Sequence, residues 1–321
     1  MRVLGQLHGT YVLAETDETA FRPAIDAHTH LFPERLADAI RRSLSDETDW
    51  EFSHPVTRPG IEDILRAAGV AAAVALPYAH EADLARELNM WLCEQAASSD
   101  LLIPFATVHP DDEDVAAVVR DAFETGARGL KIHCPVQECR PADSRLEPAL
   151  EVVAEYDRPI TYHGGTAPMF EDSPYVGVDA FAELVSSYPD LRACCAHMGT
   201  YEVEAFLNLA RDHDSVYLDT TFAMSTSAPE TMGFDPSSIA DETLIELSES
   251  IMYGSDFPNI PYPYRNERAG LLARELPQET MRDLFSRTAI DYLGLESDPD
   301  PDFGNVTAIT GGADTGGSID G

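Results

Sequence analysis

The chain has 321 residues, of which 44% are hydrophobic and 24% charged, so it carries enough apolar side chains for a large core. Asp and Glu number 57 against 21 Lys and Arg, which gives a formal net charge of −36 at pH 7. This charge repels nucleic-acid phosphates and anionic membranes, so we expect neither as a partner. No apolar run is long enough to span a membrane, and the N-terminus lacks the pattern of a signal peptide. We therefore expect a cytoplasmic protein.

The acidic residues are dispersed along the chain rather than gathered in an acidic tail. This distribution indicates a halophilic protein, because high salt screens the mutual repulsion of surface carboxylates within a few ångströms. We expect the midpoint of thermal unfolding to be higher in multimolar KCl than in dilute buffer. Melting curves followed by circular dichroism test this prediction, and a midpoint that does not change with salt would contradict it.

Short apolar runs alternate with longer amphipathic stretches, which is the pattern of repeated strand–helix units. Eight of these runs read as strands, the number found in a (β/α)₈ TIM barrel. They span residues 24–30, 70–77, 101–110, 127–134, 158–165, 191–199, 216–221 and 250–258. The fold class predicted is therefore α/β, with a distorted (β/α)₈ barrel.

The remaining segments complete a single domain over residues 1–296. Helices are expected over 81–98, 112–126, 146–156, 179–188 and 201–211, between the strands. Residues 31–69 are expected to add helices and a loop over the barrel mouth, and 276–295 to form terminal helices packed against the outside of the barrel. Residues 1–20 read as an N-terminal extension, and the Asp-, Gly- and Pro-rich stretch 297–321 as a disordered tail.

Polar residues late in the predicted strands are the candidate site, because catalytic groups in this fold project from the C-terminal strand ends. His28 and His30 are two residues apart on the first strand, so they can hold one ion from the same side. Further strand ends supply Lys131 and His133, His163, His197 and Asp256. Five histidines meeting at one barrel face would each need a buried partner in a purely structural role. The set instead predicts a divalent metal site, with zinc preferred over iron, manganese or cobalt.

The motifs DAHTH, GLKIH, TYHGG, AHMG and YGSDFP, in this order, resemble the amidohydrolase superfamily over roughly residues 22–295. The similarity is greatest to the amidohydrolase-related branch, which includes metal-dependent hydrolases and aminocarboxymuconate-semialdehyde decarboxylase-like enzymes. The resemblance implies that His28, His30, His163 and Asp256 bind the main metal. It also implies that His197 is a catalytic histidine or a ligand of a second metal.

These positions suit hydrolysis by metal-activated water, because a divalent ion lowers the pKa of bound water to about 7. Asp256 would bind the metal, accept the water's proton and pass it to the leaving group. His197 would polarise a carbonyl or stabilise the oxyanion. Asp26 would orient a ligand histidine or cap the strand end.

Lys131 is the sole lysine of the chain, beside 20 arginines. The resemblance places it where binuclear members of the superfamily carry a carboxylated lysine that bridges two metals. Arginine cannot form that carbamate, which would account for the exception. The alternative is an ammonium group that binds a substrate carboxylate or pairs with a nearby acid. One metal is favoured over two.

Other residues are secondary candidates. His109 would line the pocket or cap the following helix, and Tyr262, Tyr264 and Arg265 would contact substrate from a loop. Tyr78 and Arg140 read as surface residues.

The sequence thus predicts a metal-dependent hydrolase that cleaves an amide, lactone or ester bond of a small molecule. One alternative is a metal-dependent non-oxidative decarboxylase of a carboxylated aromatic or unsaturated acid, built on nearly the same site. Another is a barrel that binds a ligand without catalysis, which the joint presence of His197 and Asp256 argues against. The substrate stays open, and so does the oligomeric state, although the resemblance implies dimers or larger assemblies.

Overall fold

The computed structural model describes residues 24–166 and 169–295. The extension expected over 1–20 and the tail expected over 297–321 lie outside these residues. Within them, no helix is both long enough and apolar enough to cross a membrane.

The strands of the described ranges are all parallel to their neighbours and follow one another in chain order. Their bounds are β1 Ala24–Thr29, β2 Val70–Ala75, β3 Leu102–Pro104, β4 Ala106–Thr107, β5 Leu130–His133, β6 Ile160–His163, β7 Ala193–Cys195, β8 Val216–Asp219 and β9 Ile251–Met252. Every predicted strand is present in shorter form. The third is interrupted at Phe105, so β3 and β4 occupy one strand position, and the eightfold pattern holds.

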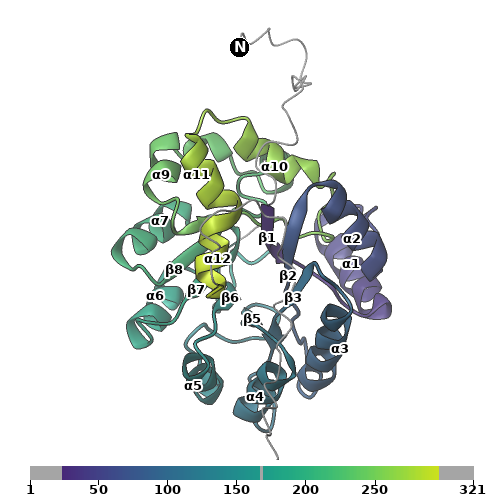
Figure 1. The fold of residues 1–321 in the computed structure, drawn as a ribbon. Helices are drawn as coiled ribbons and strands as arrows, with labels where there is room; N and C mark the ends of the chain where they lie inside the picture. The colour runs from purple at the N-terminus through teal and green to yellow at the C-terminus, as the bar shows by residue number, and fades with distance from the viewer. Residues whose placement is uncertain (1–23, 167–168, 296–321) are drawn as a thin grey trace, which may run out of the picture.

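Backbone hydrogen bonds close the strands into a barrel. Phe105 N donates to Ala75 O (3.0 Å) and Ala106 N to Gly129 O (2.8 Å), which connects the two strand groups across the interruption. Ala27 N donates to Tyr253 O (2.9 Å) and Asp256 N to His28 O (2.8 Å), which joins the first strand to the segment after the last. The strands therefore form the core of a TIM-type α/β barrel, with helices arranged around them (Figure 1).

The helices lie between the strands as the sequence predicts, and α1 and α2 fill the long connection between β1 and β2. Their bounds are α1 Glu34–Thr48, α2 Arg58–Ala67, α3 Ala85–Ala97, α4 Val115–Thr125, α5 Glu147–Glu155, α6 Val178–Ser187, α7 Val203–Asp212, α8 Ala228–Thr231, α9 Asp241–Glu246, α10 Arg265–Leu272, α11 Gln278–Arg282 and α12 Thr288–Leu293. A single π turn, Asp283–Arg287, joins α11 to α12.

Helix α4 shows how local sequence sets these bounds. Asp114 precedes the first turn, and its side chain accepts a hydrogen bond from Ala117 N (2.9 Å), which satisfies a free N–H group of the helix start. Val118 and Val119 turn toward the strands and are buried. Gly126 ends the helix with a φ of 127°, a conformation that favours glycine.

The last helix differs from its expected position outside the barrel. Ala289, Tyr292 and Leu293 of α12 pack with the inward side chains of the strands, such as Ile25 and Val74. The Tyr292 hydroxyl also forms a hydrogen bond with Thr161 of β6 (2.8 Å). Helix α12 therefore fills the end of the barrel away from the C-terminal strand ends, because its apolar face covers residues that would otherwise meet water.

Candidate metal centre and pocket

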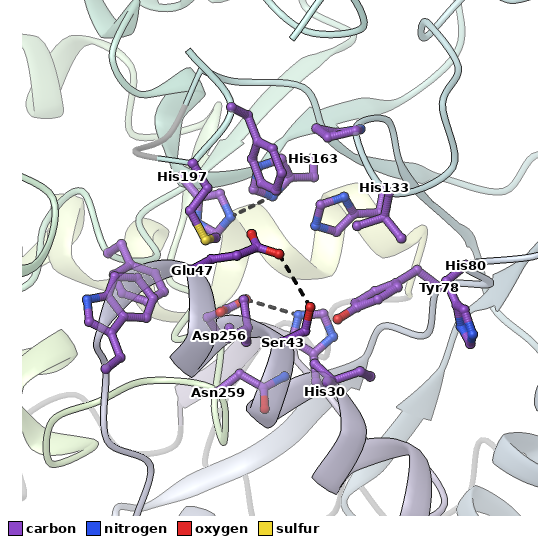
Figure 2. Close-up of a pocket in the computed structure, with 18 of the residues that line it drawn as sticks. His30, Ser43, Glu47, Tyr78, His80, His133, His163, His197, Asp256 and Asn259 are labelled. Atoms are coloured by element: carbon purple, nitrogen blue, oxygen red, sulfur yellow. Dashed lines mark hydrogen bonds and ion pairs between the residues drawn. The ribbon is translucent and has the colours of Figure 1, made fainter. Parts of the chain in front are cut away.

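Six aromatic side chains form a closed ring at the C-terminal end of the barrel. Neighbouring rings in this circle have centroids 4.3–5.7 Å apart. In order around it they are His30, His28, His197, His163, His133 and Tyr78. Five come from the strand ends named by the sequence, and the structure brings all five together. Figure 2 shows most of them around one cavity.

Two members of this circle, His28 and His30, form a tight group with Asp256. Asp256 Oδ1 lies 3.1 Å from His28 Nε2 and 3.0 Å from His30 Nε2, and one ligand atom from each residue lies within 4.8 Å of the others. His28 lies near the end of β1 and His30 directly after it, whereas Asp256 follows β9 with a φ of 59°. The barrel closure between these two elements is what brings the carboxylate to the histidines.

The hydrogen bonds behind the two imidazoles decide which nitrogens face Asp256. His30 Nδ1 lies 2.6 Å from the carbonyl oxygen of Leu76, so this nitrogen carries the proton and Nε2 presents its lone pair. His28 Nδ1 lies 2.8 Å from Asp219 Oδ2, which has the same effect on His28 Nε2. In the neutral imidazoles two lone pairs thus lie beside a carboxylate oxygen, and either a proton on Nε2 or a metal ion offsets their repulsion. These residues fit a divalent metal ion.

Asp219 is a site residue that the sequence reading missed. Besides binding His28, it accepts hydrogen bonds from His197 N (2.9 Å) and Thr221 N (3.2 Å). Burial opposes its ionisation, but His28 and these bonds outweigh burial and hold its pKa far below the usual range. The sequence contained the information needed to find Asp219, because this residue lies at the end of a predicted strand, as the candidate histidines do.

Asp26 does not have the predicted role of orienting a histidine ring. A register irregularity in β1 between Asp26 and Thr29 breaks the period of two, so Asp26 faces away from the cavity. Its carboxylate accepts hydrogen bonds from Ser255 Oγ (2.6 Å), Tyr264 Oη (2.8 Å) and His28 N (3.2 Å). Despite these bonds, complete burial raises the pKa of Asp26 to about 7.

His163 and His197 form a second pair, separate from the tight group. His197 Nε2 lies 3.2 Å from His163 Nδ1, while His163 Nε2 and His197 Nδ1 are buried without a partner among the described residues. His163, named as a metal ligand from the sequence, lies outside the His28–His30–Asp256 group but lines the same cavity. Burial lowers the pKa of His197 to about 4 and that of His163 well below its usual value.

The backbone at His197 takes an unusual course. His197, Met198 and Gly199 have φ values of 58°, 53° and 67°, three successive residues in the left-handed region. The backbone N–H of His197 donates a hydrogen bond to Asp219, and Phe206 of α7 packs against Gly199. This turn directs the His197 ring into the cavity instead of along the strand.

Lys131 lies in the same cavity, buried to 1% exposure, and its Nζ has no hydrogen-bond partner within residues 24–166 and 169–295. Burial lowers its pKa, against the attraction of Asp219 and Asp256. An unpaired buried amine or ammonium group is costly. The position therefore suits a ligand or a covalent modification at Nζ.

The cavity has a volume of about 460 Å³ and a largely apolar wall. Helix α1 crosses its mouth with Leu36, Ile40 and Leu44, and Ser43 donates to Glu47 there (3.3 Å; Figure 2). The other apolar residues of the wall are Ala39, Trp50, Tyr78, Pro135, Val136, Met169, Phe170, Phe222 and Met232. Of the segment 31–69, expected to cover the barrel mouth, the part from Leu36 to Trp50 lines the cavity, whereas α2 does not.

Several secondary predictions are wrong. Tyr78, expected at the surface, is buried and belongs to the ring of aromatic residues. Tyr262 and Tyr264 do not line the cavity, because their hydroxyls donate to the buried carboxylates of Glu267 and Asp26. Arg265 is exposed at the start of α10, outside the described lining.

Two further secondary candidates also lie away from the cavity. His109 is outside the described lining, and its backbone N–H donates to Asp112 (2.9 Å). Arg140 is a surface residue, as predicted, and pairs with Glu183.

The buried histidines predict acid sensitivity of the metal-free protein. Burial lowers the pKa of His30, His133, His163 and His197, so these rings stay neutral in the fold. In the unfolded chain they bind protons near pH 6.5. Below that pH the unfolded state binds more protons than the native state, so the free energy of unfolding falls as the pH decreases.

Three groups act in the opposite direction. Asp26, Glu267 and His28 have raised pKa values, so the native state holds their protons more tightly and gains stability as the pH falls. Half-buried His54 also has a lowered pKa, so five histidines oppose these three groups, and we expect a net loss of stability between about pH 6.5 and pH 4. Denaturant unfolding of chelator-treated protein at several pH values measures it. A free energy of unfolding that stays level or rises over this range would contradict the prediction.

Comparison with known proteins gives one family. The family model described as amidohydrolase matches residues 25–295. No curated protein matches the chain significantly.

Among solved structures, an uncharacterized TIM-barrel protein from Bordetella bronchiseptica is similar with a TM-score of 0.67 and 15% identity, covering 85% of this chain and 98% of its own. A 5-carboxyvanillate decarboxylase from Novosphingobium aromaticivorans, with bound manganese, has a TM-score of 0.55 and 17% identity over 87% of this chain and 98% of its own. A protein provisionally named 2-pyrone-4,6-dicarboxylic acid hydrolase, from Pseudomonas putida, has a TM-score of 0.61 and 18% identity over 87% of this chain and 100% of its own. At such identities the likeness shows the fold.

Proposed function

Because the chain belongs to the amidohydrolase family, we propose that it is a metal-dependent hydrolase that cleaves an amide, lactone or ester bond of a small molecule. The observation that carries this proposal is the convergence of His28 Nε2, His30 Nε2 and Asp256 Oδ1 at the floor of an apolar cavity. A divalent cation bound there, with Zn²⁺ preferred, supplies a Lewis acid for the scissile carbonyl and makes water acidic enough to attack near neutral pH.

The residues around this point have separate tasks. Asp256 keeps its carboxylate ionised, because His30 and His28 outweigh burial and lower its pKa well below the usual range. It can therefore accept the proton of the attacking water and return it to the leaving group. His163, whose Nε2 has no partner among the described residues, would be a further ligand, and His197 would polarise the carbonyl of the substrate.

Lys131 has one of two roles in this proposal. As an amine or ammonium group it binds an oxygen of the substrate, and as a carbamate it supplies two oxygens for a second metal. The single tight ligand group of the described residues supports one metal. The Nζ of Lys131, buried and without a partner among the described residues, fits either role.

Elemental mass spectrometry of protein purified without chelators tests the metal site. We expect about one divalent ion per chain, and its loss in a variant that carries both His28→Gln and His30→Gln. Two ions together with a carboxylated Lys131 in the intact mass would replace the mononuclear version by the binuclear one. No metal, even after incubation with Zn²⁺ or Mn²⁺ and bicarbonate, would refute the proposal.

Non-oxidative decarboxylation of a carboxylated aromatic or unsaturated acid is the second candidate. The apolar and aromatic wall favours it, because removal of water destabilises a substrate carboxylate relative to a transition state with dispersed charge. In that reaction the carbon–carboxylate bond breaks, CO₂ leaves, and the carbon takes a proton. The similar structure named 5-carboxyvanillate decarboxylase supports this reading, and the one named as a hydrolase supports the first.

A substrate panel separates the two reactions. Aromatic esters, lactones and amides are incubated with the metal-loaded protein beside the corresponding carboxylic acids. Release of acid from the first group without CO₂ from the second supports hydrolysis, and the reverse supports decarboxylation. Chelator-treated protein is the control, since either activity must disappear with the metal.

A further inference from the structure

His133 is a site residue without a task in the mechanism above. It ends β5, two positions after Lys131, so both side chains point to the same side of the strand and line the cavity. Its Nδ1 is buried and has no hydrogen-bond partner among the described residues. Buried polar groups are ordinarily satisfied by protein, water or ligand, and because His133 lines the cavity, a ligand there can supply the missing partner.

The backbone of His133 is held by Gln137. His133 N donates to Gln137 Oε1 (2.6 Å), Gln137 N donates to His133 O (2.9 Å), and Gln137 Nε2 donates to Val108 O (2.6 Å). Gln137 itself is buried to 1% exposure. These bonds therefore fix the backbone from which the imidazole projects toward the cavity.

Aromatic neighbours cover the sides of the imidazole. His163 stacks on it with a centroid distance of 4.3 Å and an interplanar angle of 8°. Tyr78 and Phe170 approach it at 4.9 Å and 5.6 Å. These three contacts occupy much of the apolar surface of the ring, so a ligand would interact with His133 mainly through hydrogen bonds to its nitrogens.

His133 also lies across the cavity from the tight metal group. In the strand order β5-β6-β7-β8-β9, four steps separate β5 from β9, the strand that precedes Asp256, and β9 adjoins β1. In Figure 2 the labelled His133 and Asp256 lie on opposite sides of the cavity. A molecule that reacts at Asp256 therefore has a second point of contact at His133.

We propose that His133 is a specificity-determining residue that hydrogen-bonds an oxygen substituent on the part of the substrate remote from the reacting group. The substrate class is then an unsaturated or aromatic acid, or its ester, lactone or amide, that carries a second oxygen such as a hydroxyl group. This inference rests on the proposed function, because it takes the cavity as the substrate site. Gln137 acts as a positioning residue behind His133.

Binding of simple aromatic acids tests the inference without turnover. Such an acid is both the product type of hydrolysis and the substrate type of decarboxylation. Isothermal titration of the metal-loaded protein with benzoate and with 2-, 3- and 4-hydroxybenzoate compares ligands that differ by one oxygen. We expect at least one hydroxybenzoate to bind roughly 2- to 10-fold more tightly than benzoate, the range for one added hydrogen bond.

Two variants test whether His133 causes the tighter binding of the hydroxybenzoate. His133→Phe keeps a flat ring and removes the nitrogens, so the hydroxybenzoate should lose its advantage while benzoate affinity and metal content stay unchanged. His133→Asn restores a donor and an acceptor and should recover part of the advantage, which also guards against misfolding of the first variant. His109→Phe, a histidine outside the cavity lining, is the matched control and should behave as the unaltered protein.

Three results would overturn the inference: no hydroxybenzoate preferred by the unaltered protein, a preference that survives in His133→Phe, or loss of metal in that variant. The last would make His133 a metal ligand. Failure of the proposed function has a different signature, because it shows as absence of bound metal or of any turnover in the unaltered protein.

Discussion

Replacement of Asp256 by Asn is expected to lower turnover by roughly 100- to 10,000-fold, the contribution of a positioned acid–base group. The amide keeps the shape of the side chain and one oxygen, but it cannot accept a proton at that position. It also loses the negative charge that faces His28 Nε2 and His30 Nε2, so metal affinity should fall as well. Turnover of whichever substrate the panel reveals and metal content per chain are measured on the same preparations.

Asp121→Asn makes the same chemical change on the outside of the barrel. Asp121 is exposed on α4 and pairs there with Arg86, so its variant should keep full turnover and full metal content. Supplying excess metal to Asp256→Asn separates the two effects, since recovered occupancy with low turnover assigns proton transfer to Asp256. Unchanged turnover in Asp256→Asn would remove the role assigned here to this carboxylate.

Gly199→Ala is expected to destabilise the fold by roughly 2 to 5 kcal/mol, because it combines backbone strain with overpacking. The φ of Gly199 is 67°, and an added Cβ would lie 2.0 Å from the Phe206 ring. The aromatic ring of a buried side chain cannot move that far without disturbing α7. Chemical denaturation of the metal-free variant measures the loss in the free energy of unfolding.

Gly233→Ala is the matched control. Gly233 has a similar φ of 63°, but a Cβ there would meet no atom within 4 Å. Its variant should lose only about 1 to 2 kcal/mol, the cost of a left-handed alanine. Equal losses in the free energy of unfolding would show that the Phe206 ring moves aside in Gly199→Ala. The contact between Phe206 and Gly199 would then not stabilise the turn at His197.

The barrel was predictable because its signals are local. Each strand reads as a short apolar run, and the connecting helices begin and end near the expected residues, as α4 does between Asp114 and Gly126. The histidines were predictable for a related reason. Strand ends of one barrel meet at one rim, so residues such as His28 and His163 converge although they are distant in the chain.

The parts that could not be predicted depend on tertiary structure. The irregularity in β1 turns the buried Asp26 side chain away from the cavity, whereas a strict period of two would place it on the same side as His28 and His30. Tyr78 follows β2 in a loop whose course is set by packing against His30 and His133. Tyr262 and Tyr264 look like contacts for a ligand until the buried acids that they satisfy, Glu267 and Asp26, are seen beside them.

Because Lys131 is the single lysine of the chain, its chemical labelling can be used to follow access to the cavity. The other 20 of the 21 Lys and Arg residues are arginines, and Lys131 lines the cavity with 1% exposure. A small amine-directed reagent can reach a lysine side chain only by entering the cavity. Peptide mapping separates attachment at Lys131 from attachment at the α-amino group, so the rate at Lys131 reports whether the cavity is open. A bound ligand or a carbamate on Nζ would slow that attachment, so occupancy can be followed before any substrate is known.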